Sequence, residues 1–314
     1  MIGYAINIGE HAWYKRLAPA AAALAAGYGA ELVVTDAAGD ADRQLRQLHD
    51  LLDRGARVLA ISPMDPVGLG GVLDRCAAAG VPVLTESIQV SDDRVACHLG
   101  IDEYGEGVRL GTRVGADLPA RDLVRALLVG FPPYAEAADR EAGFLSGLRR
   151  THAQVEVLCA QGGGTTAAAA GNVAALLADR LSWRPDVVFG VDDEVLVGAL
   201  ASLAAVGAFP QLTATYGISP PHGPQLLEDG TLSWGAAMLP ELHGQVLGTL
   251  CLDALAGAPV PDRVRLAAAI VTAAGHPEGW DRYYARAGDD LELIPYHAEQ
   301  LLPAGFRVRP AVPA

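Results

Sequence analysis

The chain repeats one structural unit along most of its length. Each repeat joins an apolar, β-rich run to a turn containing Gly, Pro or Asp and then to an amphipathic stretch, as in residues 2–27, 30–55 and 58–80. This alternation is typical of parallel sheets whose strands are connected by crossover helices. Such sheets bind ligands at the carboxyl ends of their strands, so candidate site residues are sought where each strand ends.

Length and composition predict a folded protein with two domains. The chain has 314 residues, which is too long for one comfortable hydrophobic core and fits two domains of about 150 residues each. Hydrophobic residues make up 51% of the chain and charged residues 19%, far from a disordered composition. No uncharged apolar run reaches the roughly 18 residues that span a bilayer.

Charge argues against a nucleic-acid partner. The formal net charge is −14, and no dense basic cluster could neutralise the phosphates of a duplex. We interpret the acidity mainly as a contribution to solubility.

The cysteines suggest neither a metal site nor a disulfide framework. Four cysteines lie far apart, without CxxC or Cys/His ligand spacing, at Cys76, Cys97, Cys159 and Cys251. We expect buried free thiols, and one disulfide is the alternative.

The periodicity places the elements in two lobes. In the first we expect strands at 2–8, 31–35, 57–61, 81–85 and 94–99 and helices at 14–27, 41–54 and 66–79. In the second we expect helices at 103–116, 135–150, 165–180, 194–206 and 222–229 and strands at 122–130, 154–159, 186–191, 212–217 and 231–238. A helix at 240–256 and a strand at 264–273 come last, before a tail from residue 276 that is expected to wrap the surface. Pro19 lies inside the first helical pattern, so that helix either starts near Leu17 or kinks.

Six short motifs give the chain a resemblance to a known family. They are His11-Ala-Trp13-Tyr14, Asp36-Ala-Ala-Gly39-Asp40, Ile61-Ser-Pro63-Met-Asp65-Pro66, Ala79-Gly80-Val-Pro82-Val, Arg140-Glu-Ala-Gly143-Phe144 and Phe189-Gly-Val-Asp192-Asp193-Glu194 with the residues that follow it. In this order and spacing they resemble the sugar-binding, ribose-binding-protein-like branch of the type I periplasmic binding proteins, which are solute receptors of ABC transporters. The resemblance runs from about residue 2 to residue 285.

The resemblance implies an α/β fold of two Rossmann-like lobes with parallel sheets, joined by a three-segment hinge. The N-terminal lobe would comprise residues 1–102 plus 239–263, and the C-terminal lobe residues 103–238 plus 264–314, including the tail. The ligand would be held between the lobes by a hinge motion. Two sheets that face each other with their carboxyl edges form a cleft from which closure excludes water.

The resemblance also implies ligand-binding residues. Trp13 and Tyr14 match the family's aromatic pair, whose flat faces cover the apolar faces of a sugar ring; core packing is the alternative for Trp13. His11 matches a polar position that contacts the ligand; the alternative is a structural histidine hydrogen-bonded to the backbone. Glu86 matches an acidic residue that accepts from sugar hydroxyls, against a solvated loop carboxylate. Asp192 matches a polar position, against a simple helix N-cap.

Several positions depart from the family pattern. Asp193, next to the candidate Asp192, is expected to be the helix cap. An arginine that often follows the acidic residue is Ser87 here, an expected Asp is Ile218 beside Ser219, and an expected Gln is Met238. Ser219 and Met238 therefore complete the set of candidate ligand contacts. A pocket without those arginines favours hydroxyl or amine donors over carboxylate or phosphate ligands.

Enzyme motifs are not found. The sequence lacks GxGxxG, GxxxxGK[ST], GxSxG, HExxH and EF-hand spacings, so we expect no catalytic residues, no cofactor and no metal. Glu86 and Asp192 could serve acid–base chemistry only if their carboxyl groups converge.

The resemblance therefore implies a non-enzymatic receptor that needs no cofactor: a monomeric solute-binding protein that captures a small sugar or polyol and hands it to an ABC transporter permease. It would be extracytoplasmic, although the sequence shows no signal peptide, and cytoplasmic if Met1 is the true start. A stand-alone cytosolic ligand-sensing domain is the alternative, and the upstream reading frame discriminates the two.

Overall fold

The computed structural model describes residues 1–131, 135–163, 165–180, 182–218, 222–266 and 268–272. The described chain forms two compact units. The first contains Met1–Ile101 and the later residues 239–266, and the second contains Asp102–Met238 and residues 268–272. Over the residues that the structure describes, the chain therefore passes from one unit to the other three times.

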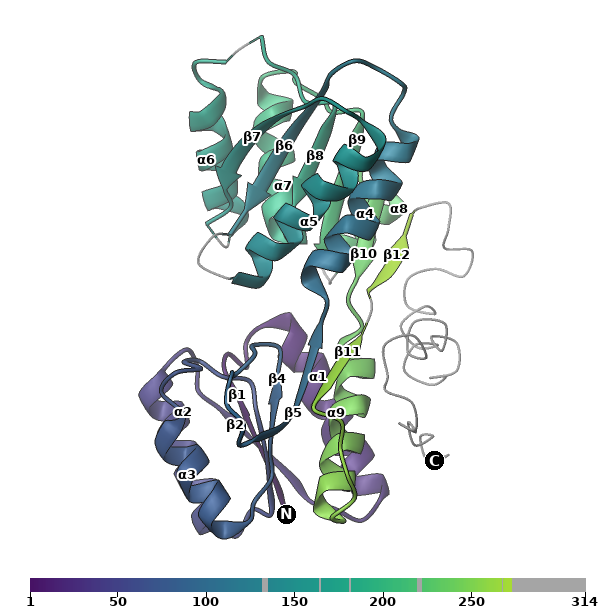
Figure 1. The fold of residues 1–314 in the computed structure, drawn as a ribbon. Coiled ribbons are helices and arrows are strands. Elements are labelled where there is room, and N and C mark those ends of the chain that lie inside the picture. Colours follow the sequence, from purple (N-terminus) through teal and green to yellow (C-terminus); the bar gives the residue numbers. More distant parts are fainter. Residues whose placement is uncertain (132–134, 164, 181, 219–221, 267, 273–314) are drawn as a thin grey trace. The chain divides into compact units, whose positions relative to one another are not determined.

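Within the described residues, the first unit is built on a sheet of six strands with the spatial order β11-β5-β4-β3-β1-β2. The strands are β1 (Ile2–Ile6), β2 (Leu32–Asp36), β3 (Val58–Ile61), β4 (Val83–Glu86), β5 (Val95–Ile101) and β11 (Arg263–Leu266). The helices are α1 (Ala12–Gly27), α2 (Ala41–Asp53), α3 (Gly70–Ala79) and α9 (Pro240–Leu255). Neighbouring strands pair in parallel, and α2 and α3 cover one face while α1 and α9 cover the other (Figure 1).

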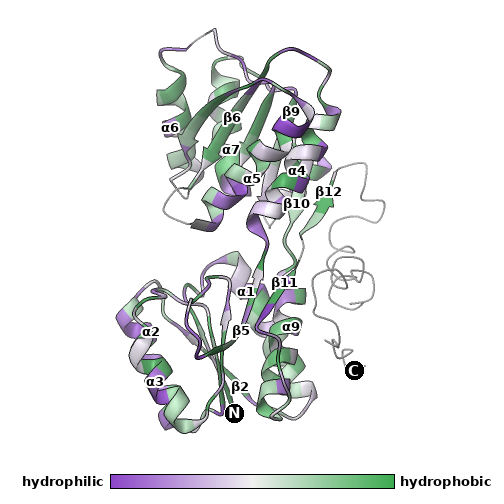
Figure 2. Cartoon of the chain, viewed as in Figure 1, coloured by the Kyte–Doolittle hydropathy of each residue, from purple (hydrophilic) through white to green (hydrophobic). Residues whose placement is uncertain are grey.

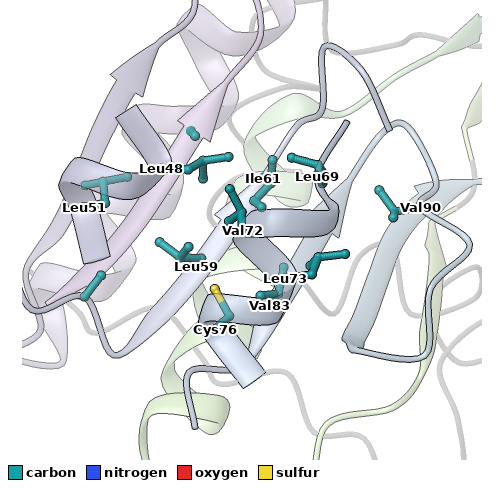
Figure 3. Packing of buried hydrophobic residues seen from close by; sticks show 12 residues of the cluster. Leu48, Leu51, Leu59, Ile61, Leu69, Val72, Leu73, Cys76, Val83 and Val90 are labelled. Carbon is teal, nitrogen blue, oxygen red and sulfur yellow. The ribbon is translucent and has the colours of Figure 1, made fainter. Parts of the chain in front are cut away.

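The core between this sheet and its first helical layer follows from the apolar spacing. Leu48 and Leu51 of α2 face Leu59 and Ile61 of β3 and Leu73 of α3, and all five are at most 1% exposed (Figure 3). Burying each such side chain contributes about 1.5–3 kcal/mol. The opposite side of α2 is hydrophilic (Figure 2) and carries no part of this core. The packing of α2 and α3 on the sheet holds in place the strands whose ends form the site.

Within the described residues, the second unit is also built on six strands, in the order β12-β10-β9-β8-β6-β7. The strands are β6 (Val124–Gly130), β7 (Val155–Gln161), β8 (Val187–Gly190), β9 (Leu212–Gly217), β10 (Trp234–Ala237) and β12 (Ala269–Val271). The helices are α4 (Glu103–Asp117), α5 (Ala135–Thr151), α6 (Thr166–Leu177), α7 (Asp193–Ala205) and α8 (His222–Glu228). The α4–α5 pair and the α6–α7 pair lie on opposite faces of the sheet (Figure 1).

The two parallel-sheet lobes expected from the sequence are confirmed, with one correction to the elements. The single strand expected at 264–273 is two strands, because β11 pairs in parallel with β5 while β12 pairs antiparallel with β10. The second sheet therefore has one antiparallel edge strand. The expected path of the tail from residue 276 lies outside the described residues.

Cys159 corrects the expectation of four buried thiols. All four cysteines are free, but Cys159 is exposed while Cys76, Cys97 and Cys251 are buried. Cys159 lies on β7, the edge strand, whose residues are all partly or fully exposed. A separate observation concerns membranes: in the described part of the chain, no helix has the length and hydropathy of a bilayer crossing.

Candidate functional site

The first turn of α1 presents the aromatic pair immediately after β1. The helix begins at Ala12 with His11 as its N-cap, and the His11 Nδ1 accepts from the Trp13 backbone N–H at 3.2 Å. His11 is exposed, and its ring is hydrogen-bonded to the backbone, which is the alternative that the sequence allowed for this residue. Trp13 is half-buried and Tyr14 is buried, so the two rings project differently from the same turn.

Glu86 is the last residue of β4 and is fully buried. Its carboxylate accepts from the Ser62 hydroxyl at 2.6 Å, the Trp13 indole N–H at 3.1 Å and the Tyr4 hydroxyl at 3.4 Å. The alternative of a solvated loop carboxylate is therefore wrong. Burial raises the pKa of Glu86 from 4.5 to about 7, against the lowering effect of these three donors.

Tyr14 joins the same cluster. Burial, together with the nearby charge of Glu86, raises the pKa of Tyr14, whereas hydrogen bonds with Ser62, Asn7 and Ser87 act in the opposite direction. The first unit thus gathers Trp13, Tyr14 and Glu86 where β1, β3 and β4 end. An indole, a phenol and a carboxylate at one sheet edge can cover an apolar face and accept from hydroxyl groups.

The residues after two strands are held in an uncommon backbone conformation. Ser87 follows β4 with φ of 65°, and Ile218 follows β9 with φ of 51°. Left-handed φ in a non-glycine residue costs about 1–3 kcal/mol and is found mainly at functional sites. Both residues stand at positions where the sequence departs from the family pattern.

In the second unit, Asp192 caps a helix. Its carboxylate accepts from the Val195 backbone N–H at 2.8 Å at the start of α7. The assignment of the cap to Asp193 was wrong, because Asp193 is buried and its carboxylate accepts from the Ile218 backbone N–H at 3.2 Å. Asp192 remains half-buried, so capping leaves part of its carboxylate accessible.

Arg140 lies near Asp192, but its guanidinium is paired with the carboxylate of Glu103. Its Nε and Nη2 donate to the two oxygens of Glu103 at 2.8 and 2.9 Å, and its guanidinium lies 4.4 Å from the centre of the Tyr216 ring. This contact set agrees with a structural arginine. Met238 follows β10 half-buried, and its N–H donates to the Gly217 carbonyl at 3.1 Å. Ser219 lies outside the described residues.

The structure therefore groups His11, Trp13, Tyr14 and Glu86 in the first unit, and places Asp192 and Met238 at strand ends of the second. The sequence reasoning missed three neighbours of this group: Tyr4, Ser62 and His243. Ser62 stands in the motif Ile61-Ser-Pro63, which could have indicated it, because it directly follows β3. Tyr4 and His243 lie in apolar patterns that carry no such signal.

Comparison with known proteins decides the family. The model of the periplasmic binding protein domain matches residues 2–259. The chain belongs to the periplasmic binding protein family. Members of this family are solute-binding proteins, so this periplasmic binding protein is not an enzyme, as the sequence predicted.

Curated relatives and solved structures agree with the family. The chain is 28% identical to the ribose import binding protein of Escherichia coli over 222 residues, 69% of this chain and 71% of the relative. A Mycobacterium smegmatis structure in complex with β-D-fucofuranose has 23% identity and a TM-score of 0.76, covering 95% of this chain and 97% of that one. A Bacillus halodurans solute-binding protein with bound myo-inositol has 19% identity and a TM-score of 0.77, covering 91% and 97%. These likenesses confirm the type I periplasmic binding protein fold.

Proposed function

We propose that this chain is the sugar- or polyol-binding component of an ABC transporter. The observation that carries the proposal is the fully buried Glu86 carboxylate, bonded to the Trp13 indole at the carboxyl edge of the first sheet. The half-buried indole offers an aromatic face for the C–H surface of a sugar, and the carboxylate that holds the indole places an acceptor behind that face. The names of the relatives, which mention ribose, fucofuranose and myo-inositol, support this class of ligand.

The charges around the candidate residues favour a neutral ligand. No lysine or arginine is among the described groups that shift the pKa of Glu86. In the second unit, the fork of Arg140 is engaged by Glu103. A phosphate or carboxylate ligand would therefore face the carboxylates of Glu86 and Asp192, and the arginine near Asp192 is already paired with Glu103; the cost of this repulsion grows as water is excluded.

The ligand would be enclosed by hinge closure between the two units. The three passages of the chain between the units support a hinge of three segments. In this scheme Trp13, Tyr14, Glu86 and His11 act from the first unit, and Asp192, Ser219 and Met238 from the second. The protein works as an extracytoplasmic monomer that hands its ligand to the permease.

Isothermal titration and thermal shift with a ligand panel test the proposal. The panel contains D-ribose, D-fucose, D-allose, myo-inositol, glycerol and ribose 5-phosphate. We expect a neutral sugar or polyol to bind and the phosphate ester to bind more weakly. Preferential binding of ribose 5-phosphate, or no binding across the panel and a wider carbohydrate library, contradicts the proposal.

Trp13→Ala supplies the residue-level test. Loss of a stacking indole should weaken binding by about 30-fold or more, since truncation of a central Trp costs about 2 kcal/mol and upwards. Trp183→Ala is the matched control, because the Trp183 indole N–H also donates to a glutamate, Glu156, at 2.9 Å, but in an exposed part of the second unit. Unchanged affinity in Trp13→Ala would assign that indole to packing.

A further inference from the structure

His243 is a buried polar side chain without a polar partner. It lies on α9 and is 2% exposed, and neither of its ring nitrogens has a hydrogen-bond partner in the described structure. A buried nitrogen that lacks a hydrogen bond normally costs about 1–3 kcal/mol. A leucine at this position of an apolar helix would avoid that cost, so the imidazole needs another explanation.

The contact of His243 with Trp13 provides one. The two rings lie 4.8 Å apart between centres with an interplanar angle of 83°, which is an edge-to-face arrangement. In such a pair the positive edge of one ring meets the negative face of the other. Burial lowers the pKa of His243 to about 3, so the ring that meets the indole is neutral at neutral pH.

The two helices that carry these rings are packed closely. A Cβ added to Gly244, next to His243, would lie 2.2 Å from the Leu17 carbonyl oxygen of α1. Arg16 of α1 also pairs with Glu241 of α9. The backbones of α1 and α9 are therefore held close together, which limits how far the Trp13 and His243 rings can move apart.

Trp13 is held at a second point by the hydrogen bond from its indole N–H to Glu86. One hydrogen bond fixes the position of the indole nitrogen but allows the ring to tilt about it. A ring contact from a second element removes that freedom. The cost of ordering the indole is then met before any ligand arrives, which increases affinity.

We propose that His243 is a positioning residue, which fixes the orientation of the Trp13 indole by an edge-to-face contact and does not itself touch the ligand. The step from indole orientation to affinity rests on the proposed function. The step from His243 to indole orientation does not, because it concerns two residues of the same unit.

The first experiment observes Trp13 without any ligand. Replacing Trp183, Trp234 and Trp280 by Phe leaves Trp13 as the single indole of the chain. In this background, His243→Ala and His243→Leu should lower the fluorescence anisotropy of Trp13 and raise its acrylamide quenching constant by about twofold or more. His243→Phe keeps an aromatic ring and should retain both values near those of the parent.

The choice of variants separates positioning from general packing. His243→Leu keeps most of the volume and removes the ring, so it remains informative if His243→Ala unfolds. Cys251→Ala is the control, because Cys251 is fully buried on the same helix; it should reduce stability and leave Trp13 quenching unchanged. Unchanged quenching and anisotropy in His243→Leu would overturn the proposal.

The second experiment measures affinity for those members of the sugar panel that bind the parent chain. His243→Leu should weaken binding by about three- to tenfold, the range expected for loss of an aromatic pair, while His243→Phe should stay near the parent. Weaker binding with an unchanged Trp13 signal would make His243 a direct contact and overturn the proposal. If neither the panel nor the wider carbohydrate library contains a ligand of the parent chain, the proposed function fails, and the fluorescence experiment still decides the role of His243.

Discussion

At the scale of single residues, the buried carboxylates couple stability to pH. Glu86 has its pKa raised from 4.5 to about 7 by burial, so the folded chain holds this proton at pH values where the unfolded chain has released it. The free energy of unfolding therefore falls as pH rises from about 4.5 to about 7, by on the order of 3 kcal/mol for a shift of this size. Glu106 contributes in the same direction, because burial raises its pKa to about 7 as well.

Glu86→Gln should remove the contribution of Glu86. We expect urea unfolding of the variant to show a smaller loss of stability between about pH 5 and about pH 8 than the parent, since the amide carries no charge to bury. Glu31→Gln, at an exposed position, is the control and should leave the pH dependence as it is. An identical pH dependence in Glu86→Gln and the parent would show that Glu86 does not titrate in this range.

The sequence located Trp13, Tyr14 and Glu86 but not the groups that hold them. A βα pattern predicts where each strand ends, so the residues that follow the strands can be predicted as site candidates. The structure brings these three together, and their role in binding stays a prediction. Tyr4, Ser62 and His243 come from three other elements. Their contacts with the site depend on which strands and helices become neighbours, which local periodicity does not encode.

At the scale of elements, α4 and α5 pack through glycine. An added Cβ at Gly111 would lie 2.1 Å from the Phe144 carbonyl oxygen, and one at Gly147 would lie 2.3 Å from the Val108 carbonyl oxygen. The helix backbones thus approach too closely for any side chain between them. Sequence periodicity predicted both helices, but it could not show that their glycines serve close packing and do not weaken the helices.

Gly111→Ala tests this packing. The methyl group meets backbone atoms that cannot move aside, so we expect the free energy of unfolding to fall by about 1–3 kcal/mol. Gly171→Ala in α6 is the matched control, since an added Cβ meets nothing within 4 Å, and should raise stability by about 0.5–1 kcal/mol through helix propensity. Chemical denaturation of the two variants measures both effects. Equal stabilities would mean that α4 and α5 separate at little cost.

The first helix shows why boundaries are harder to predict than elements. The sequence suggested a start at 14 or near Leu17, but α1 begins at Ala12 and contains Pro19 in its interior. Its cap is His11, which is not among the preferred N-cap residues Ser, Thr, Asp and Asn. The residue type that usually marks a helix start is therefore missing at this position, and Pro19 wrongly suggested a start near Leu17.

At the scale of the whole molecule, the point at which the chain last crosses from one unit to the other was the hardest feature to predict from the sequence. The apolar run at 264–273 looks like one strand, yet β11 and β12 pair in different sheets and in opposite senses. Which sheet edge each half joins is decided by partner strands far back in the chain: Arg263 of β11 pairs with His98, 165 residues earlier, and Val271 of β12 pairs with Gly235, 36 residues earlier. Periodicity alone could predict two lobes, but not where this last crossing falls.

Ligand binding should stabilise both units if they share the ligand. At a concentration of 100 times the dissociation constant, a bound sugar adds about 2.7 kcal/mol to the free energy of unfolding. Hydrogen exchange should slow in the first unit around Glu86 and in the second unit around Asp192. Trp13→Ala, with its affinity weakened about 30-fold or more, should reduce the added stability at that ligand concentration to about 0.9 kcal/mol or less and weaken the protection in both units, whereas Trp183→Ala should retain it. Protection confined to the first unit would mean that the ligand is held by one lobe alone, and hinge closure would have to be abandoned.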